Sequence, residues 1–416
     1  MPKEILYLSY HFPPYSNILS NRATEFSKRL IESDYKIFVV SAKNNKNATI
    51  DKELLKTVDS PLIKNAQVYN LSFSSSGVAS SVKKISILKE IFNIFLFFHW
   101  LPLSFAKSSR IIRKNHIRLI YTSAPPFFSL VLGYLLKKIF KIPLITEYRD
   151  PWSDNPYFLG NISEFTKRNY NKIDKKVLKT SDAIIAISEG LKEYLIKAFP
   201  SIVKEDKVFA IPNGLDMSSF LATNVNIPQS NKIVLTFTGK LYGLRDLKPL
   251  IKIISSVKEL GKLEGVSLKI NIFGRYNYEN LSNLIQKYKV SEYFSLNGFI
   301  PRNECLEEIS ESTLTLHVGE NINYPTISFK VWDYLSMRKK IVYLGREDSF
   351  TARFLKDNNL GFTIPVNNHD LGVKKFISLI DRLISNQIKL EVDPKQLSKY
   401  TWDNLTPKLI SIFNKF

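Results

Sequence analysis

Cysteine is almost absent from this chain of 416 residues, which contains only Cys305. A single cysteine excludes an internal disulfide and a cysteine-cluster metal site, and it suits a reducing compartment such as the cytoplasm. Glycine and proline are also scarce, with 15 and 19 residues, which excludes collagen-like and low-complexity chains. The first strand-to-helix loop lacks a G-x-G-x-x-G fingerprint, so a classical dinucleotide site is not expected there.

The chain also lacks a long uninterrupted apolar run. The most apolar stretch, 91–106, is broken by Asn93, His99 and Pro102 and is shorter than the roughly 20 residues that span a bilayer. Lysines and arginines flank it, which suits a helix lying in the interface of an anionic membrane, although a helix packed under the first domain remains an alternative. The first residues predict a strand rather than a signal peptide.

Positive charge is abundant. The chain has 59 Lys and Arg against 38 Asp and Glu, a net charge of +21. Such a field attracts nucleic acids, anionic lipids or phosphorylated substrates. No RNA- or DNA-binding motif and no long basic tract accompanies it, so no nucleic-acid partner is expected.

Short β-branched or aromatic runs alternate with amphipathic stretches of helical length along both halves of the chain. This alternation predicts βαβ units and parallel sheets. Proline, glycine and charge gather at 200–216, which is typical of a boundary. We therefore expect an α/β protein with one domain at 1–205 and a second at 206–397. The amphipathic segment 398–416 predicts a helix that packs back on the first domain.

Polar residues follow several predicted strands of the first domain. Ligands of open α/β sheets bind beyond the carboxyl ends of the strands, so these loops are candidate binding loops. The candidates on the acceptor side are His11, Pro14, Arg22, Ser123 and Trp152. Arg149 and Asp150 follow the predicted central strand and are candidate catalytic residues. Structural alternatives are a proline-rigidified connection for the first loop and an Arg149–Asp150 turn before Pro151.

In the second domain, Gly239 and Lys240 end a strand and Arg245 follows in the next loop. A glycine lets backbone N–H groups approach an anion, and the two cations could neutralise a diphosphate leaving group. Thr326 and Ser328 stand at a predicted helix start, which also favours anions. Lys330 and Asp333 share a helix face, and a surface ion pair is the alternative explanation for both.

Seven segments occur in the order found in family 4-like glycosyltransferases of the GT-B fold. They are YHFPP, SAPP, IPLITEYRDPW, SDAIIAISEGL, IPNGLD, FTGKLYG and ISFKVWDYLS. The chain resembles this family over nearly its whole length, and it is similar to a subgroup with an RDPW segment. The resemblance implies two Rossmann-like domains facing a cleft.

The resemblance also implies a function: retaining, metal-independent transfer of a sugar from a nucleoside-diphosphate sugar, with no cofactor. The donor-binding candidates on this basis are Gly239, Phe299, Ile300, Tyr324, Thr326, Ile327, Ser328, Lys330 and Asp333. Asp333 resembles the ribose-binding acidic residue of the family. The sequence departs from the family pattern at 15–17, where paired glycines are usual, at Pro325, where a glutamate is usual, and at Arg149–Asp150, where a histidine is usual.

Our mechanistic hypothesis is that Lys240 and Arg245 stabilise the leaving diphosphate. Asp150 would orient or deprotonate an acceptor hydroxyl, and Arg149 would position one partner. The expected acceptor is a saccharide or a polyprenyl-pyrophosphate-linked saccharide, used in cell-surface polysaccharide synthesis on the inner face of the membrane. A catalytically silent nucleotide-sugar-binding protein and a GT-B sugar-nucleotide epimerase are the alternatives.

Overall fold

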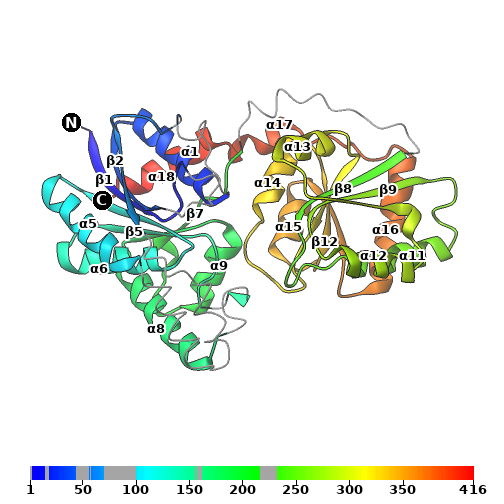
Figure 1. Ribbon diagram of the computed structural model, residues 1–416, viewed down its shortest axis with the longest axis horizontal. Helices are drawn as coiled ribbons and strands as arrows, with labels where there is room; N and C mark the ends of the chain where they lie inside the picture. Colours follow the sequence, from blue (N-terminus) through cyan, green and yellow to red (C-terminus); the bar gives the residue numbers. More distant parts are fainter. Residues whose placement is uncertain are drawn as a thin grey trace. The chain divides into compact units, whose positions relative to one another are not determined.

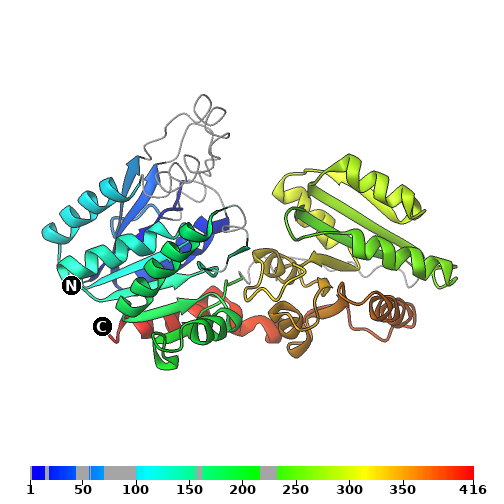
Figure 2. The same ribbon diagram turned by 90° about the horizontal axis from the view of Figure 1, so that it is seen from below.

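The computed structural model describes residues 2–14, 18–43, 56, 58–69, 100–153, 155–156, 162–215 and 232–416. The chain forms two compact units, Met1–Gly214 with Trp402–Phe416, and Leu215–Thr401. Figures 1 and 2 show that each unit is built on a β-sheet with helices on both of its faces.

The sheet of the first unit has seven parallel strands in the order β3-β2-β1-β4-β5-β6-β7. The strands are β1 (Lys3–Ser9), β2 (Tyr35–Lys43), β3 (Ile63–Tyr69), β4 (Leu119–Ala124), β5 (Leu144–Tyr148), β6 (Ala183–Ala186) and β7 (Val208–Ala210). The order changes direction at β1 and β4. Ligands of doubly wound folds bind beside such a switch point, at the carboxyl ends of the strands.

Helices cover both faces of this sheet. They are α1 (Ile18–Glu32), α5 (Leu101–Lys114), α6 (Phe128–Phe140), α8 (Glu164–Thr180), α9 (Glu189–Ala198) and α18 (Trp402–Phe413), with a 3-10 turn at Glu205–Lys207. Alternate residues of β1 serve the two faces: Leu6 and Leu8 pack with α6 and α8, whereas Ile5 and Tyr7 pack with α1 and α18. This alternation follows from the period of two in a strand, and it explains why β1 has apolar residues on both faces.

The first unit extends beyond the boundary that the sequence predicts at 205/206. Val208–Ala210 forms β7 and pairs in parallel with β6, so these residues complete the first sheet. The C-terminal segment is also divided differently from the predicted helix 398–416. Ser398–Tyr400 is a 3-10 turn of the second unit, and Thr401 pairs with Leu215. Only α18 packs on the first sheet, where Trp402 and Leu405 are buried.

The second unit contains six parallel strands in the order β10-β9-β8-β11-β12-β13. The strands are β8 (Lys232–Lys240), β9 (Ser267–Arg275), β10 (Phe294–Gly298), β11 (Leu314–Val318), β12 (Ile341–Gly345) and β13 (Gly361–Pro365). The change of direction lies between β8 and β11. The prediction of two Rossmann-like parallel-sheet domains is confirmed.

Two helical layers enclose this second sheet. The helices are α11 (Lys248–Glu259), α12 (Tyr278–Lys287), α13 (Arg302–Ser310), α14 (Phe329–Ser336), α15 (Phe350–Asp357), α16 (His369–Ile384) and α17 (Pro394–Leu397), with a 3-10 turn at Ser291–Tyr293. One core joins the sheet to α11, α12 and α16, and a second core contains side chains of α14 and α15. α14 contacts β11 and β12, and its Tyr334 accepts a hydrogen bond from the N–H of Thr238 near the carboxyl end of β8.

The apolar stretch 91–106 is described only from Trp100 onward, and Phe95, Phe97 and Phe98 lie outside the described residues. Trp100 is fully buried and contacts the rings of Tyr10 and Phe128 at 5.6 and 5.5 Å between centroids. Trp100 therefore belongs to the core of the first unit, whereas Leu103 of the same stretch is 43% exposed. No helix among the described residues is both long and apolar enough to cross a membrane.

Candidate active site

The loops after β1, β4 and β5 meet at the carboxyl edge of the first sheet, as predicted for parallel strands. Register pairs Ser123 at the end of β4 with Glu147 of β5. The Arg149 N–H donates to the carbonyl of Ala124 at 3.1 Å, which joins the β5 loop to the β4 exit. The sequence candidates Ser123, Arg149 and Asp150 therefore come from neighbouring strands of one sheet edge.

A fully buried carboxylate, Glu147, organises this edge. Arg22 donates to its Oε1 through Nε at 2.9 Å and through Nη2 at 2.8 Å. Tyr121 Oη donates to the same oxygen at 2.8 Å, and Ser123 Oγ donates to Oε2 at 2.6 Å. Burial raises the pKa of the Glu147 carboxyl, but the positive charge and hydrogen bonds of Arg22 outweigh burial and hold the pKa below its usual value. Glu147 is therefore an ionised structural centre.

The same contacts place Arg22 away from the surface. Its guanidinium is fully buried and also donates to the carbonyls of Ile211 at 2.8 Å and Pro212 at 2.6 Å. These bonds tie α1 to β5 and to the segment after β7. The predicted role of Arg22 on the acceptor side does not fit this position, because its donors are already committed inside the fold.

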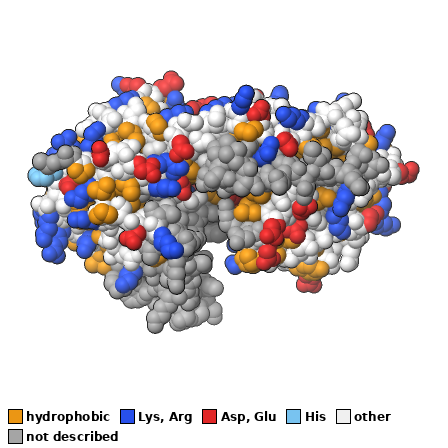
Figure 3. All heavy atoms as spheres, turned by 90° about the horizontal axis from the view of Figure 1, so that it is seen from above, with side chains coloured by type: hydrophobic (Ala, Val, Ile, Leu, Met, Phe, Trp, Pro, Cys, Tyr) orange, Lys and Arg blue, Asp and Glu red, His pale blue; other side chains and the backbone are white. Residues whose placement is uncertain are grey.

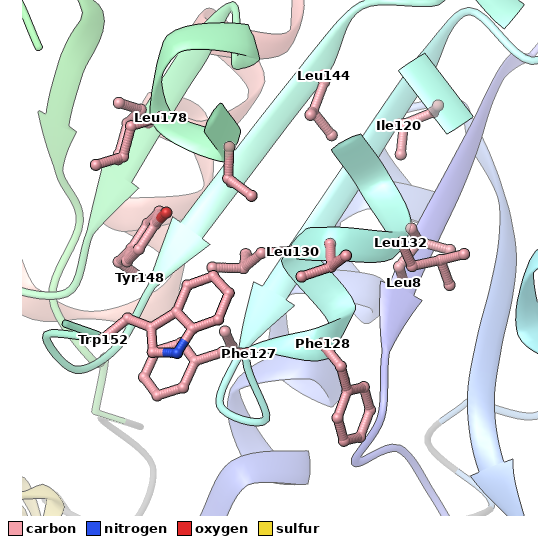
Figure 4. Packing of buried hydrophobic residues seen from close by; sticks show 14 of the residues in the cluster. Leu8, Ile120, Phe127, Phe128, Leu130, Leu132, Leu144, Tyr148, Trp152 and Leu178 are labelled. Carbon is pink, nitrogen blue, oxygen red and sulfur yellow. The ribbon is translucent and has the colours of Figure 1, made fainter. Parts of the chain in front are cut away.

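Trp152 is likewise a core residue rather than an exposed acceptor contact. Only 1% of its surface is exposed, and its ring stacks on Phe127 with a centroid distance of 5.2 Å and an interplanar angle of 1°. Figure 4 shows this stack beside Tyr148 and Leu130. The indole of tryptophan has a large apolar surface, and burial of this surface is favourable. Because the Trp152 ring packs against the start of α6, it is not exposed to an acceptor.

His11 and Arg149 act on each other electrostatically at this edge. Arg149 is 7% exposed and donates from Nη1 to the carbonyl of Leu19 at 2.9 Å. Burial, and then the positive charge of Arg149, lowers the pKa of His11 to about 4, so the imidazole is neutral at pH 7. His11, Pro14 and Asp150 are partly exposed. Of the first-unit candidates, these three retain surface that a ligand could reach.

In the second unit, Lys330 of α14 reaches across to the end of β8. A side chain at position 239 would occupy the place of Lys330 Nζ, and Gly239 has a φ of 133°, which favours glycine. Lys330 Nζ also lies over the Phe237 ring at 4.9 Å from its centroid. Burial and then the positive charge of Arg245 lower the pKa of Lys330 to about 8, although the negative charge of Asp333 opposes this. One electrostatic cluster beside Gly239 thus contains the charged side chains of Arg245, Lys330 and Asp333.

Arg245 is held by an acidic residue that the sequence analysis did not single out. Its Nε and Nη2 donate to Glu320 Oε1 at 3.0 and 2.7 Å, and the two side chains are 15% and 10% exposed. Lys240 is exposed, and its Nζ lies 5.0 Å from the centroid of the Tyr242 ring. Glu320 follows β11 directly, so the rule of strand-end loops that singled out Gly239 and Arg149 would also have found it.

The remaining donor candidates lie in two loops. Phe299 and Ile300 follow β10, and Phe299 is 67% exposed, with Arg275 at 5.2 Å from its ring centroid. The loop before α14 holds the other candidates, of which Tyr324 and Ile327 are buried and Thr326 and Ser328 are partly exposed. Because Ile327 packs in the core under α14, only its backbone could meet a ligand.

Two further buried residues support this cluster and were missed by the sequence analysis. Tyr334 of α14 accepts from the Thr238 N–H at 3.0 Å and fixes the end of β8. His317 of β11 is 2% exposed and stacks on Tyr343 at 5.8 Å. Burial, with the positive charges of Arg245 and Lys330, holds the pKa of His317 well below its usual value. Nothing in the local sequence distinguishes these two from ordinary core residues.

The residues around the carboxyl edge of the first sheet match a known family model. Residues 19–219 match the model described as Glycosyltransferase Family 4, which covers most of the first unit. Most of the first unit is therefore similar to the domain that this family model describes. No curated protein sequence matches the chain.

Solved structures similar to the whole chain include other GT-B proteins. HepE from Anabaena in complex with UDP has a TM-score of 0.66 at 13% identity, over 99% of this chain and 100% of that one. Sucrose-phosphate synthase from Thermosynechococcus elongatus has a TM-score of 0.68 at 13% identity, over 99% and 98%. The lipopolysaccharide outer core galactosyltransferase WaaB in its apo form has 0.63 at 14% identity, over 99% and 100%. These likenesses establish the GT-B fold of the chain.

Proposed function

We propose that the chain is a glycosyltransferase that moves a sugar, such as a hexose, from a nucleoside-diphosphate sugar to a saccharide or lipid-linked acceptor. One observation carries this proposal: Lys330 and Arg245 converge on the end of β8, where the missing side chain of Gly239 makes room for the Lys330 ammonium group. The family 4 match of the first unit supports it independently. UDP is bound by HepE, a protein of the same fold, so a uridine nucleotide is the first donor to test.

On the donor side, a diphosphate would bind where the positive charges of the second unit gather. Lys330 and Lys240 have ammonium groups at or beside the end of β8, and neither has an acidic ion-pair partner among the described residues. Negative charge develops on the leaving diphosphate as the glycosidic bond breaks, and cations already in place stabilise that charge without reorganising. Asp333 would accept hydrogen bonds from the ribose, and Phe299 and Ile300 would flank the base.

On the acceptor side, Asp150 would orient or deprotonate the attacking hydroxyl. Its neighbour Arg149 is anchored to Leu19 and lies beside neutral His11, so the backbone of this loop is firmly placed. A fixed carboxylate within hydrogen-bond reach of the hydroxyl is what general-base assistance requires. Arg149 would keep its positioning role through this anchoring, since its side chain is largely buried.

Three features of this proposal rest on the resemblance alone. They are transfer with retention of configuration, independence of metal ions and cofactors, and work in cell-surface polysaccharide synthesis. Association with the inner face of an anionic membrane is supported by the net charge of +21. On the face in Figure 3, Lys and Arg side chains are interspersed with Asp and Glu rather than gathered in one patch.

The first experiment is a thermal-shift panel of UDP, GDP, ADP and dTDP and of their sugars, on the wild type and on Lys240→Ala and Lys330→Ala. We expect one nucleotide series to stabilise the wild type and both variants to lose most of that shift. Incubation of the stabilising nucleotide sugar with candidate acceptors, followed by mass spectrometry, then tests transfer. The absence of a shift with every nucleotide would overturn the proposal.

A catalytically silent binding protein is the alternative, and Pro325 favours it, since a glutamate is usual there in the family that the chain resembles. Nucleotide binding without transfer or donor hydrolysis would support that alternative. Interconversion of two nucleotide sugars without an acceptor would instead indicate an epimerase.

A further inference from the structure

A basic pocket lies at the opposite edge of the first sheet from the candidate acceptor loops. Its volume is about 780 Å³, within the usual range for ligand sites. The lining residues are Tyr134, Lys137, Lys138, Lys176, Lys179, Thr180, Ser181, Asp182 and Lys207. They belong to the last turns of α6 and α8 and to the residues just before β6 and β7, so the pocket opens at the amino ends of the strands. The two helices lie side by side on one face of the sheet (Figure 1).

The single carboxylate of this pocket is already occupied. Asp182 Oδ2 forms an ion pair with Lys137 and accepts the N–H of Leu144 at 2.6 Å. These two contacts fix the carboxylate at the start of β5. Five lysines and one aspartate therefore leave a net charge of +4 around the hollow.

Lys207 lines the pocket next to the end of α8. Its Nζ donates to the carbonyls of Leu178 at 3.0 Å and Lys179 at 3.4 Å. Burial lowers the pKa of Lys207, the charge of Asp182 opposes this, and the like charge of Lys137 lowers it further. An additional negative charge beside Lys207 would therefore be stabilised.

Three more lysines surround the mouth. Lys138, Lys176 and Lys179 are exposed, and none has an acidic ion-pair partner among the residues that the structure describes. A lysine near a helix C-terminus interacts favourably with the helix dipole, which explains one cation at each helix end. It does not explain why two helices direct several lysines into one hollow, where the like charges repel each other.

We propose that this pocket binds the phosphate groups of an anionic ligand, at a site separate from the diphosphate site proposed for the second unit. Lysine ammonium groups bind phosphate as mobile point charges. The hydroxyls of Tyr134, Thr180 and Ser181 line the same pocket and can add hydrogen bonds. The phosphate can belong to a soluble compound or to a lipid headgroup, because both carry a phosphate group with one or two negative charges.

Hydrogen–deuterium exchange of the full chain tests this proposal with local resolution. The probes are inorganic pyrophosphate and vesicles of phosphatidylcholine with or without phosphatidic acid. We expect slower exchange in peptides covering 134–141 and 176–182 with at least one probe. Protection by pyrophosphate indicates a soluble ligand, and protection only by phosphatidic acid vesicles indicates a lipid headgroup.

The decisive variant is Lys138→Ala/Lys176→Ala/Lys179→Ala. These side chains are exposed, so the fold should persist, which the exchange pattern of the sheet strands checks directly. The control variant, Lys252→Ala/Lys262→Ala/Lys287→Ala, removes the same charge from exposed positions of the second unit. We expect at least a tenfold loss of apparent affinity at the pocket in the first variant and less than a twofold change in the control.

Two outcomes would overturn the proposal. One is the absence of protection at both peptides with every probe, and the other is an equal loss in the two variants, which would indicate general charge attraction. Peptides covering 237–245 report separately on the proposed diphosphate site, so failure of one site is distinguishable from failure of the other.

Discussion

The two sheets each carry an arginine–glutamate pair at the carboxyl edge, and the two pairs differ in burial. In Arg22–Glu147 both side chains are 0% exposed, and the glutamate also accepts from Tyr121 and Ser123. In Arg245–Glu320 the side chains are 15% and 10% exposed, and both arginine donors meet one carboxylate oxygen. The first pair is part of the core, whereas the second retains exposed surface.

This difference in burial indicates that the two arginine–glutamate pairs have different roles. A fully buried ion pair rarely stabilises a fold more than apolar packing would, but breaking it leaves an uncompensated charge in the interior. The Arg22–Glu147 pair therefore fixes which segments meet at the first edge. A partly exposed pair can exchange its carboxylate for a ligand anion at low cost, which suits Arg245 to a donor site.

Removing the buried carboxylate should have the largest effect. We expect Glu147→Gln to lower the free energy of unfolding of the first unit by about 3–5 kcal/mol, because Arg22 then remains buried without its counter-charge. Glu320→Gln is the matched control and should cost at most about 2 kcal/mol. Urea denaturation followed by tryptophan fluorescence measures both; Trp100, Trp152 and Trp402 report on the first unit. Equal losses of unfolding free energy in the two variants would contradict the proposed difference between the two pairs.

Asp150→Asn should separate catalysis from donor binding. We expect transfer to fall by about 100-fold or more, since general-base assistance contributes roughly that much, while the Kd for the donor stays within twofold. Initial rates of transfer and calorimetric titration with the nucleoside diphosphate give the two quantities. Asp59→Asn, at an exposed position of the same unit, serves as the control. Full activity in Asp150→Asn would remove this residue from the mechanism.

Lys330 should make donor binding depend on pH. Its pKa is about 8, and only the ammonium form attracts a diphosphate, so affinity should fall as the pH rises through 8, by up to tenfold per pH unit. Lys330→Met should lower the affinity at pH 7 by about tenfold and remove this dependence between pH 7 and 9. Calorimetric titration at several pH values measures it, with Lys252→Met as the control. A pH dependence that persists in Lys330→Met would assign it to another group.

The smallest expected effect concerns His11. Its pKa in the folded state, about 4, lies below the ordinary 6.5, so the unfolded chain binds more protons between these values and acid favours unfolding. The first unit should lose about 1 kcal/mol of stability between pH 6.5 and 4 through this partly exposed group, and His11→Gln should lose less. Urea midpoints at pH 7 and 4.5 test this, with exposed His369→Gln for comparison. Unchanged acid sensitivity in His11→Gln would contradict the assignment.

Local sequence features predicted the elements and the places where loops gather. Apolar runs predicted the strands because both faces of each parallel sheet are buried, and residues after those runs had to reach one edge. Arg149, Asp150 and Gly239 were found in this way, whereas Lys330 was a candidate because of its helix face and the family resemblance. Lys207 and the lysines of α6 and α8 were not found, because they converge only at the opposite edge of the folded sheet.

The sequence by itself determined the period of the strands, the two α/β units and the strand ends that carry polar loops, since each depends on neighbours within a few residues. The tertiary structure alone decided the roles of Arg22 and Trp152. Arg22 meets Glu147, 125 residues away, and Trp152 meets Phe127 across the start of α6. The local sequence around an arginine beside a binding loop is the same whether the arginine binds a ligand or a distant glutamate. Only the folded chain determines which charged group lies next to the buried guanidinium.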